Sequence, residues 1–575
     1  MPFVLQSGAP EFSGKTHMAS ATPLLQTGQS SSERIFPRLS PSQFARVAAH
    51  GRARNVSAGE VLYAAGDQTP PFVVVVKGEV EVTRQTRFGE ALVAVHGPGQ
   101  FTGEVNLISG RRALVDARVK TPGEVIELDR DRLLALVQTD AELGEILMRA
   151  FILRRVELIA RGLGDAVIIG SRHCAGTLRV KEFLTRNAHP FTYLDLDLDA
   201  DVQELLDRFH VTAADVPIVV CRCEIVLRNP TNAEIAECLG FNTAVDPLHV
   251  HDVVVVGGGP AGLAAAVYAA SEGLDVLVVE GRYPGGQAGS SSKIENYLGF
   301  PTGISGQALA GRAYTQAQKF GAQMLVAKCA ARLDCDTRPY GLGLGDSTRV
   351  GARSIVIATG AQYRKPPLPD LPRFEGVGVY YGATFMEAQL CAGEEVIVIG
   401  GGNSAGQAAV FLAQTAKRVH MLVRSGGLAE SMSRYLIRRI EDHPDITLHT
   451  HTELVALEGT VNLERVAWRN RVTGQVELRS IRHVFVMAGA MPATNWLGSC
   501  VAVDSKGFVL TGADLTAEVL ANARWPLSRP PHLLETSMPG VFAVGDVRAG
   551  NIKRVASAVG EGSIAISFVH RVLAE

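Results

Sequence analysis

The stretch Asp252-Val-Val-Val-Val-Gly257-Gly-Gly259-Pro-Ala-Gly262 decides the fold of the carboxy-terminal half of this chain. An apolar strand precedes the glycines, a helix of small residues follows them, and the next apolar strand ends in an acid, Glu280. Gly257 permits a tight turn, and Gly259 lets backbone amides approach a pyrophosphate at the helix N-terminus. Glu280 is placed to accept hydrogen bonds from ribose hydroxyls. The stretch therefore predicts a parallel-sheet dinucleotide-binding fold, against the alternative of an incidental glycine-rich turn.

A second motif of the same kind is Glu395-Val-Ile-Val-Ile-Gly400-Gly-Gly402-Asn-Ser-Ala405. The strand that follows it ends in Arg424 instead of an acid, and Arg434 lies further along. A guanidinium fork suits a ribose 2′-phosphate, which favours NADPH over NADH. The alternative is that these arginines belong to a solvated helix face.

Length and composition place the chain among multidomain globular proteins. It has 575 residues, 46% hydrophobic and 20% charged, which is enough for three or four domains. The formal net charge of −2 gives no attraction to nucleic acid or to an anionic membrane. The eight cysteines have irregular spacings, which favours a reducing, cytoplasmic compartment and argues against a disulfide framework or a structural metal. The uncharged run Val253–Ala270 is interrupted by its glycines, so we predict a strand, a turn and a helix instead of a membrane span.

Changes in composition and periodicity divide the chain. Residues 1–34, rich in Ser, Thr, Gly and Pro, are expected to form a disordered leader. Residues 35–163 predict a small β-roll with C-terminal helices, and residues 164–245 follow the order β-α-β-α-β-β-α. In this second part, strands are predicted at 166–170, 191–195, 216–221 and 224–228, and helices at 178–186, 201–209 and 232–239. The two glycine motifs place the remainder in two parallel-sheet nucleotide folds, residues 250–365 with 488–575, and the inserted residues 366–487.

Further motifs accompany the glycine turns: Gly285-Gly286-Gln287, Ile294-Glu295-Asn296-Tyr297, Ile357-Ala358-Thr359-Gly360 and the run Thr536–Asp546. With them, residues 251–575 resemble a low-molecular-weight thioredoxin reductase of the pyridine nucleotide–disulfide oxidoreductase superfamily. The resemblance implies an FAD- and NADPH-dependent oxidoreductase, with FAD on the first fold, NADPH on the second, and a homodimer. It implies FAD contacts from Gly257, Gly259, Pro260, Ala261, Gly262, Glu280, Gln287, Asn296, Thr359, Gly360, Gly545, Asp546, Val555 and Ala556. It implies NADP contacts from Gly400, Gly402, Asn403, Ser404, Ala405, Arg424 and Arg434.

One departure from this family concerns the dithiol. The reductases carry a Cys-x-x-Cys before the second glycine motif, where this chain has Gly382 and Phe385. Neither side chain forms a thiolate, so the usual relay to thioredoxin is chemically excluded there. Hydride transfer from nicotinamide to flavin needs positioning and no protein nucleophile, so we expect it to survive. The nearby Cys391 is interpreted as a structural residue.

The middle part resembles a thioredoxin or glutaredoxin fold. Its first strand ends in a turn where Cys174 occupies the first-cysteine position and Thr177 replaces the second. A helix N-terminus stabilises a thiolate, and Val216-Pro217 resembles the cis-proline that faces it. Two interpretations of Cys174 stay open. It is either a catalytic monothiol, with Cys221 or Cys223 as a resolving thiol, or part of a degenerate docking domain.

The amino-terminal part predicts short strands at 60–63, 71–76, 79–84, 91–96, 113–119 and 124–128, followed by a helix over 141–158. With the run Gly97–Glu104, it resembles a cyclic nucleotide-binding β-roll. The resemblance implies a cyclic AMP or cyclic GMP site formed by Gly103, Glu104, Arg112 and Ala113, with Arg111 as an alternative to Arg112. The alternative is a structural β-roll that serves regulation or dimer contacts.

The leading functional hypothesis is an FAD-dependent NADPH oxidoreductase without the dithiol relay, regulated through the β-roll. Its electron acceptor is left open among the chain's own Cys174, a ferredoxin-like or quinone-like carrier and an external disulfide. The resemblance to ferredoxin–NADP reductases of this fold, which lack the dithiol, supports the ferredoxin-like or quinone-like carrier. The alternative is a redox- or cyclic-nucleotide-sensing flavoprotein with little turnover. Hinges are expected near Lys365 and at Met487–Gly489.

Overall fold

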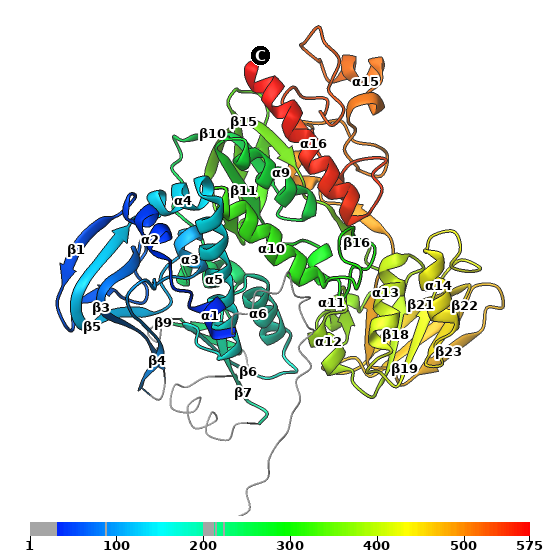
Figure 1. Cartoon of the computed structure of the whole chain (residues 1–575). Helices are drawn as coiled ribbons and strands as arrows, with labels where there is room; N and C mark the ends of the chain where they lie inside the picture. Colours follow the sequence, from blue (N-terminus) through cyan, green and yellow to red (C-terminus); the bar gives the residue numbers. More distant parts are fainter. Residues whose placement is uncertain (1–30, 87–88, 199–211, 213–214, 222–224) are drawn as a thin grey trace, which may run out of the picture.

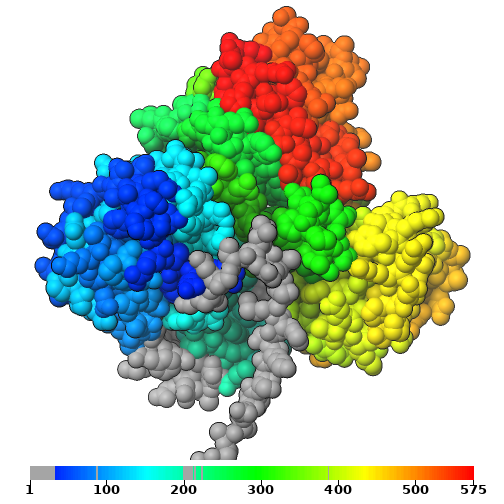
Figure 2. All heavy atoms as spheres, viewed as in Figure 1, coloured from blue at the N-terminus to red at the C-terminus, as the bar shows by residue number. Residues whose placement is uncertain are grey.

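A computed structural model describes residues 31–86, 89–198, 212, 215–221 and 225–575 of the chain. The amino-terminal part and the second nucleotide fold lie on opposite sides of the first nucleotide fold (Figure 1). The space-filling view shows the same arrangement, with residues 366–487 forming a lobe of their own (Figure 2). Multidomain architecture is therefore confirmed.

The amino-terminal part is an antiparallel β-roll in the order β1-β5-β3-β4, with β2 paired to β5. Its strands are β1 Arg52–Val56, β2 Val61–Tyr63, β3 Phe72–Thr86, β4 Gly89–His96 and β5 Asp116–Leu128. Its helices are α1 Ser31–Ile35, α2 Pro41–Ala48, α3 Val105–Ser109, α4 Arg130–Thr139 and α5 Ala141–Ala160. The runs predicted at 71–76 and 79–84 form one strand, since Gly78 (φ 88°) absorbs a bulge between them. The last four residues of the predicted leader are helical.

The middle part has the sheet order β7-β6-β8-β9, with β6 parallel to β7 and antiparallel to β8. This topology confirms the thioredoxin-like prediction, and the Val216–Pro217 peptide bond is cis as expected. The strands are β6 Ala166–Gly170, β7 Phe191–Asp195, β8 Ile218–Cys221 and β9 Ile225–Arg228, and the helices are α6 Ala175–Arg186 and α8 Asn232–Cys238. The helix predicted at 201–209, and Cys223, lie outside the described residues.

The first nucleotide fold is built on a seven-stranded sheet in which β10 is central, with β26 added beside β15. Its strands are β10 Val250–Val256, β11 Val276–Glu280, β12 Gln323–Val326, β13 Ala330–Asp334, β14 Tyr340–Leu344, β15 Arg349–Ile357 and β26 Val541–Ala543. Its helices are α9 Pro260–Ser271, α10 Gly306–Lys319, α15 Ala517–Asn522 and α16 Val555–Ala574. The short 3-10 turns are η2 Ala288–Ser290, η3 Asn495–Leu497, η4 Gly512–Asp514 and η5 Gly545–Val547. Because β10 is buried on both faces, it is apolar at successive positions, as parallel sheets require.

The second nucleotide fold has a five-stranded parallel sheet in the order β17-β24-β18-β19-β20, beside a three-stranded sheet β21-β22-β23. Its strands are β17 Val379–Tyr380, β18 Glu395–Ile399, β19 Arg418–Leu422, β20 Ile446–His449, β21 Thr452–Glu458, β22 Arg465–Asn470, β23 Val476–Arg479 and β24 His483–Val486. Its helices are α11 Leu371–Phe374, α12 Phe385–Leu390, α13 Asn403–Leu412 and α14 Arg434–Glu441. The antiparallel pair of β16 Ala361–Tyr363 and β25 Ala490–Pro492 joins the two folds at the predicted hinges.

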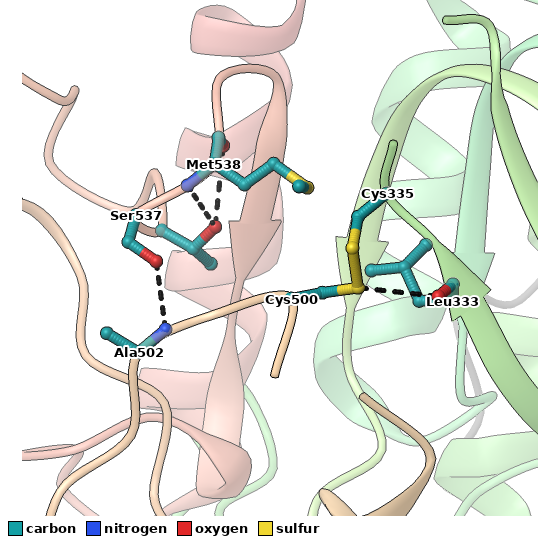
Figure 3. The surroundings of a disulfide bond; sticks show 7 residues. Leu333, Cys335, Cys500, Ala502, Ser537 and Met538 are labelled. Atoms are coloured by element: carbon teal, nitrogen blue, oxygen red, sulfur yellow. Dashed lines mark hydrogen bonds between the residues drawn. A yellow bond between two sulfur atoms is a disulfide. The ribbon is translucent and has the colours of Figure 1, made fainter. Parts of the chain in front are cut away.

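A disulfide joins Cys335, just after β13, to Cys500, just after η3 (Figure 3). The prediction that the cysteines form no disulfide framework is wrong at this pair, because the two residues are 165 positions apart and only the fold brings them together. The Cys500 sulfur lies 3.3 Å from the Leu333 carbonyl oxygen. The segment after Cys500 is fixed by a hydrogen bond in which the Ala502 amide donates to Ser537 Oγ at 2.8 Å. The bond thus ties the loop after η3 to the edge of the sheet.

Two buried arginines are among the residues that attach the amino-terminal and middle parts to the first nucleotide fold. Arg111, 6% exposed, donates to Tyr314 Oη on α10 at 2.8 Å. Arg186, at the end of α6, donates to Ser290 Oγ at 2.7 Å. Among the described residues no helix is long and apolar enough to cross a membrane, and the run Val253–Ala270 forms strand β10 and helix α9 as predicted.

Candidate active site

The first glycine turn is closed so tightly that side chains do not fit. Gly257 has φ 112°, and a Cβ there would lie 2.3 Å from the Ala358 carbonyl oxygen. A Cβ on Gly262 would lie 1.8 Å from the Gly257 carbonyl oxygen. Gly259 caps α9, so the free amides of the first helical turn point out of the turn, where an anionic diphosphate is stabilised. These residues fit a dinucleotide pyrophosphate.

Glu280 ends β11 beside this turn. Its carboxylate accepts from the Gly258 amide at 2.6 Å and from the Arg282 amide at 2.8 Å. Burial raises the pKa of the Glu280 carboxyl, and these amides oppose that rise. The carboxylate is therefore placed at the rim of the cradle, where ribose hydroxyls would be bound.

A second element of the same site is the turn at η5. Gly545 has φ 73°, and its amide donates to Glu561 Oε2 of α16 at 2.7 Å. Glu561 also accepts from Arg548 at 2.6 Å and from Asn551 at 2.8 Å. Burial raises the pKa of the adjacent Asp546 carboxyl, although Lys553 lowers it. Glu561 was not predicted from the sequence, where its one signal is that it is the acid within helix α16.

The remaining predicted flavin contacts lie on several elements of the first nucleotide fold. Helix α16 begins at Val555, with Ala556 next, so their amides lie in its first turn. Thr359 Oγ1 donates to the Ala493 carbonyl at 2.8 Å, and Gly360 has φ 66°. Asn296 is exposed. Pro260 and Ala261 form the first turn of α9.

A cavity of about 400 Å³ separates the two nucleotide folds. Residues of both folds line it, namely Gln287, Ser290, Ser291, Ser292, Tyr363, Tyr381, Gly382, Ala383, Ser404, Gln407, Ala408 and Met487. A Cβ on Gly382 would lie 3.6 Å from the Ser290 Cβ. Gly382 therefore faces the loop formed by Gln287 and η2, called the flavin-side loop below. Phe385 is 68% exposed. Among the described residues no cysteine lines this cavity, and the sequence contains no Cys-x-x-Cys.

Cys391 behaves as a structural residue. It is fully buried beneath the second sheet, and burial raises the pKa of its thiol to about 12. A thiol with so high a pKa stays protonated and is a poor nucleophile. This supports the structural interpretation.

The second glycine turn repeats the geometry of the first. Gly400 has φ 138°, and a Cβ there would lie 2.5 Å from the Met487 carbonyl oxygen. Gly402 caps α13, and Asn403 Oδ1 accepts from the Ser433 amide at 2.8 Å. Ser404 lines the cavity, and Ala405, in the first turn of α13, is buried. These residues fit a second pyrophosphate.

The predicted phosphate arginines lie at the open edge of this fold. Arg424 follows the carboxyl end of β19, and Arg434 begins α14; both are exposed. Arg424 lowers the pKa of Glu453, although Arg469 has the larger effect on that carboxyl. Arg439 is engaged elsewhere, since it pairs with Glu295 of the first nucleotide fold at 2.7 Å.

Cys174 caps helix α6 and is half-buried, with its sulfur 3.9 Å from the Val216 carbonyl oxygen before the cis-proline. Thr177 Oγ1 is buried and has no hydrogen-bond partner among the described residues. A Cβ on Gly376, in the second nucleotide fold, would lie 2.9 Å from the Ala175 Cβ. The α6 N-terminus therefore lies against the nucleotide-binding lobe, about 18 Å along the helix from the Arg186–Ser290 contact.

The predicted cyclic nucleotide residues separate into two groups. Gly103, Glu104 and Ala113 line a cavity of the β-roll. Arg112 packs instead beside Gly240, where a Cβ would lie 2.5 Å from Arg112 Nε. Arg111 also does not line the cavity, because it contacts Tyr314 and lies 4.2 Å from the Phe241 ring.

Two glycine turns, each followed by a helix N-terminus and each in its own nucleotide fold, define an oxidoreductase with two dinucleotide sites. The profile of the pyridine nucleotide-disulphide oxidoreductase family matches residues 251–562, and the chain belongs to this family. The carboxy-terminal part is an FAD- and NAD(P)H-dependent oxidoreductase of the thioredoxin reductase-like type. A cyclic nucleotide-binding domain profile matches residues 53–140.

Individual relatives support this assignment. The chain is 30% identical over 320 residues to a thioredoxin reductase of Ureaplasma parvum, covering 56% of this chain and 96% of that protein. It is 32% identical over 327 residues to a thioredoxin reductase of Mycolicibacterium smegmatis, covering 57% of this chain and 97% of that protein. The crystal structure of Lactococcus lactis thioredoxin reductase in the FR conformation aligns with a TM-score of 0.50 at 26% identity, covering 56% of this chain and 99% of that one.

Proposed function

We propose that this protein oxidises NADPH through bound FAD without a dithiol relay. The electrons pass to an acceptor, and the usual dithiol-dependent reduction of thioredoxin is not the route. The observation that carries this proposal is the cavity between the two folds. The position next to the flavin-side loop is Gly382, and Phe385 points to solvent, so no sulfur is available there to receive electrons.

The chain's own residues would position the two nucleotides. When bound, NADPH and FAD supply hydride transfer, which needs alignment more than it needs a protein acid or base. The turns at Gly257–Gly262 and Gly400–Ala405 would hold the diphosphates, and Glu280 the ribose of FAD. Asp546 would bind the ribitol of FAD, and its position is fixed by the hydrogen bond from the Gly545 amide to Glu561. Gln287 would line the flavin ring. The β16–β25 pair would act as the hinge of domain rotation.

The preference for NADPH is tested at Arg424. We expect Arg424→Ala to raise the KM for NADPH roughly tenfold and to leave that for NADH within about twofold, because an exposed charge-assisted contact to phosphate contributes on the order of 1.5 kcal/mol. Steady-state kinetics with both nucleotides measures this. Arg418→Ala, an exposed arginine at the other end of β19, is the matched control and should change neither value. An equal rise for both nucleotides contradicts the 2′-phosphate assignment.

The acceptor is tested with Cys174→Ser. A small quinone would reach the cavity directly, so we expect its reduction to proceed at the wild-type rate in this variant. Attack of the Cys174 thiolate on a low-molecular-weight disulfide would release one thiol and leave a mixed disulfide, and the reduced flavin would have to supply the electron pair that releases the second thiol. Loss of disulfide reduction in the variant would show that this route operates. Unchanged disulfide reduction would make the thioredoxin-like part a docking element. Negligible NADPH oxidation with every acceptor, despite bound flavin, would favour the sensor alternative over the enzyme.

The amino-terminal part has a physical route to regulate the flavin site. Helix α3, which borders the β-roll cavity, packs against α10 of the first nucleotide fold. Arg111 follows α3 and is buried between Tyr314 of α10 and Phe241. Binding of a ligand in the β-roll cavity would therefore act, through α3 and Arg111, on helix α10, which follows the flavin-side loop.

A further inference from the structure

The β-roll has a cavity between strands β3 and β4, the segment 103–115 and helix α5. Most of its wall is apolar and includes Val82, Val93, Leu114, Val115 and Leu158. A ligand of this cavity must therefore present a largely apolar body.

One buried cation in the wall is only partly satisfied. Arg154 of α5 is 7% exposed and donates from Nε to the Ile35 carbonyl at 3.0 Å and from Nη1 to the Gly103 carbonyl at 2.8 Å. Its Nη2 is buried and has no hydrogen-bond partner among the described residues. The guanidinium carbon lies 5.2 Å from the Phe36 ring centre and 4.7 Å from that of Phe101. An unsatisfied buried donor on a charged group requires a partner.

The other charges around the cavity compensate one another. Glu104 is 6% exposed and accepts from Arg155 Nε at 2.9 Å, so two guanidiniums, of Arg154 and Arg155, face one carboxylate. At the rim, Glu157 pairs with Arg161 at 2.6 Å. When Arg155, which pairs with Glu104 from outside the wall, is counted with the wall residues, the net charge is a single positive one. Arg154 is then the cation of this group that pairs with no carboxylate among the described residues.

A second unsatisfied atom belongs to His96, at the end of β4. Its Nδ1 is buried and has no partner among the described residues, and its ring centre lies 5.8 Å from that of Phe36. Burial, aided by the charge of Arg154, lowers the pKa of His96 to about 3, so the ring is neutral at physiological pH. With its proton on Nδ1 it is a donor that adds no charge.

We propose that this cavity binds an amphipathic monocarboxylate. One ligand oxygen accepts from Arg154 Nη2 and the other from His96 Nδ1, while the apolar body lies along Val93, Leu114 and Leu158. The phosphate of a cyclic nucleotide would need an arginine of the segment 103–115, and both arginines there are outside the cavity wall. This inference deepens the regulatory part of the proposed function by naming the ligand class.

Calorimetric titration of the full-length flavoprotein tests the proposal. The titration contains no NADPH, so a failure of the ligand proposal is distinguishable from a failure of the enzymatic proposal. The probes are octanoate, octanamide, cyclic AMP and cyclic GMP. We expect octanoate to bind at one site per chain, about ten- to a hundredfold more tightly than octanamide, because a charge-assisted hydrogen bond contributes about 1.5–3 kcal/mol. Cyclic nucleotides should not displace it.

Two variants complete the test. Arg154→Met should bind octanoate and octanamide equally, and Arg149→Met, which removes an exposed arginine of the same helix, should keep the wild-type preference. Equal binding of octanoate and octanamide by the wild type overturns the proposal without reference to any variant, even if Arg154→Met fails to fold. Retained preference in Arg154→Met, or tighter binding of a cyclic nucleotide than of octanoate, also overturns it.

Discussion

Gly262→Ala is expected to yield a folded protein that purifies with little or no flavin. The new methyl group would lie 1.8 Å from the Gly257 carbonyl oxygen, so the turn that presents the amides to the diphosphate must move. Overpacking of this kind costs about 1–3 kcal/mol, which corresponds to roughly ten- to a hundredfold in FAD affinity when the cost falls on the bound conformation. Flavin absorbance per chain after gel filtration measures the effect.

The matched control is Gly311→Ala. Gly311 also lies in a helix of the first nucleotide fold, and a Cβ there meets no atom within 4 Å. Alanine is the better helix former, so this variant should keep its flavin and lose no stability. Full flavin content in Gly262→Ala would mean that the turn does not form the diphosphate site.

The elements that could be predicted from the sequence are those with local causes. Strands β6 and β7 were predicted with the bounds that the structure has, because each is a short apolar run between turns. The cis bond before Pro217 was expected from the resemblance of Val216-Pro217 to the cis-proline of the thioredoxin fold. Both glycine turns have the positive φ angles that their motifs indicated, at Gly257 and Gly400.

The features that were missed depend on contacts between distant segments. Cys335 and Cys500 form a disulfide that the spacing of cysteines does not indicate. Arg111 was considered for a phosphate, yet it is buried against Tyr314, 203 positions away. Arg154 lies in a helix that was predicted from its periodicity. The packing of α5 on the β-roll decides which arginine of this helix faces the cavity. Pattern alone carries no such tertiary information.

The second large effect concerns how many electrons the protein stores. A flavin accepts one electron pair, and a redox dithiol beside it would accept a second. Gly382 and Phe385 supply no sulfur, and Cys174 lies at the far end of α6 from the contact with the flavin-side loop. We therefore expect the flavin to be the one centre that NADPH reduces.

Anaerobic titration of the purified protein with NADPH measures this directly, with flavin absorbance and free thiols followed together. The account predicts that bleaching of the flavin is complete at about one NADPH per chain and that no thiols appear. An end point near two NADPH per chain, with two new thiols, would show a dithiol centre coupled to the flavin and contradict the account.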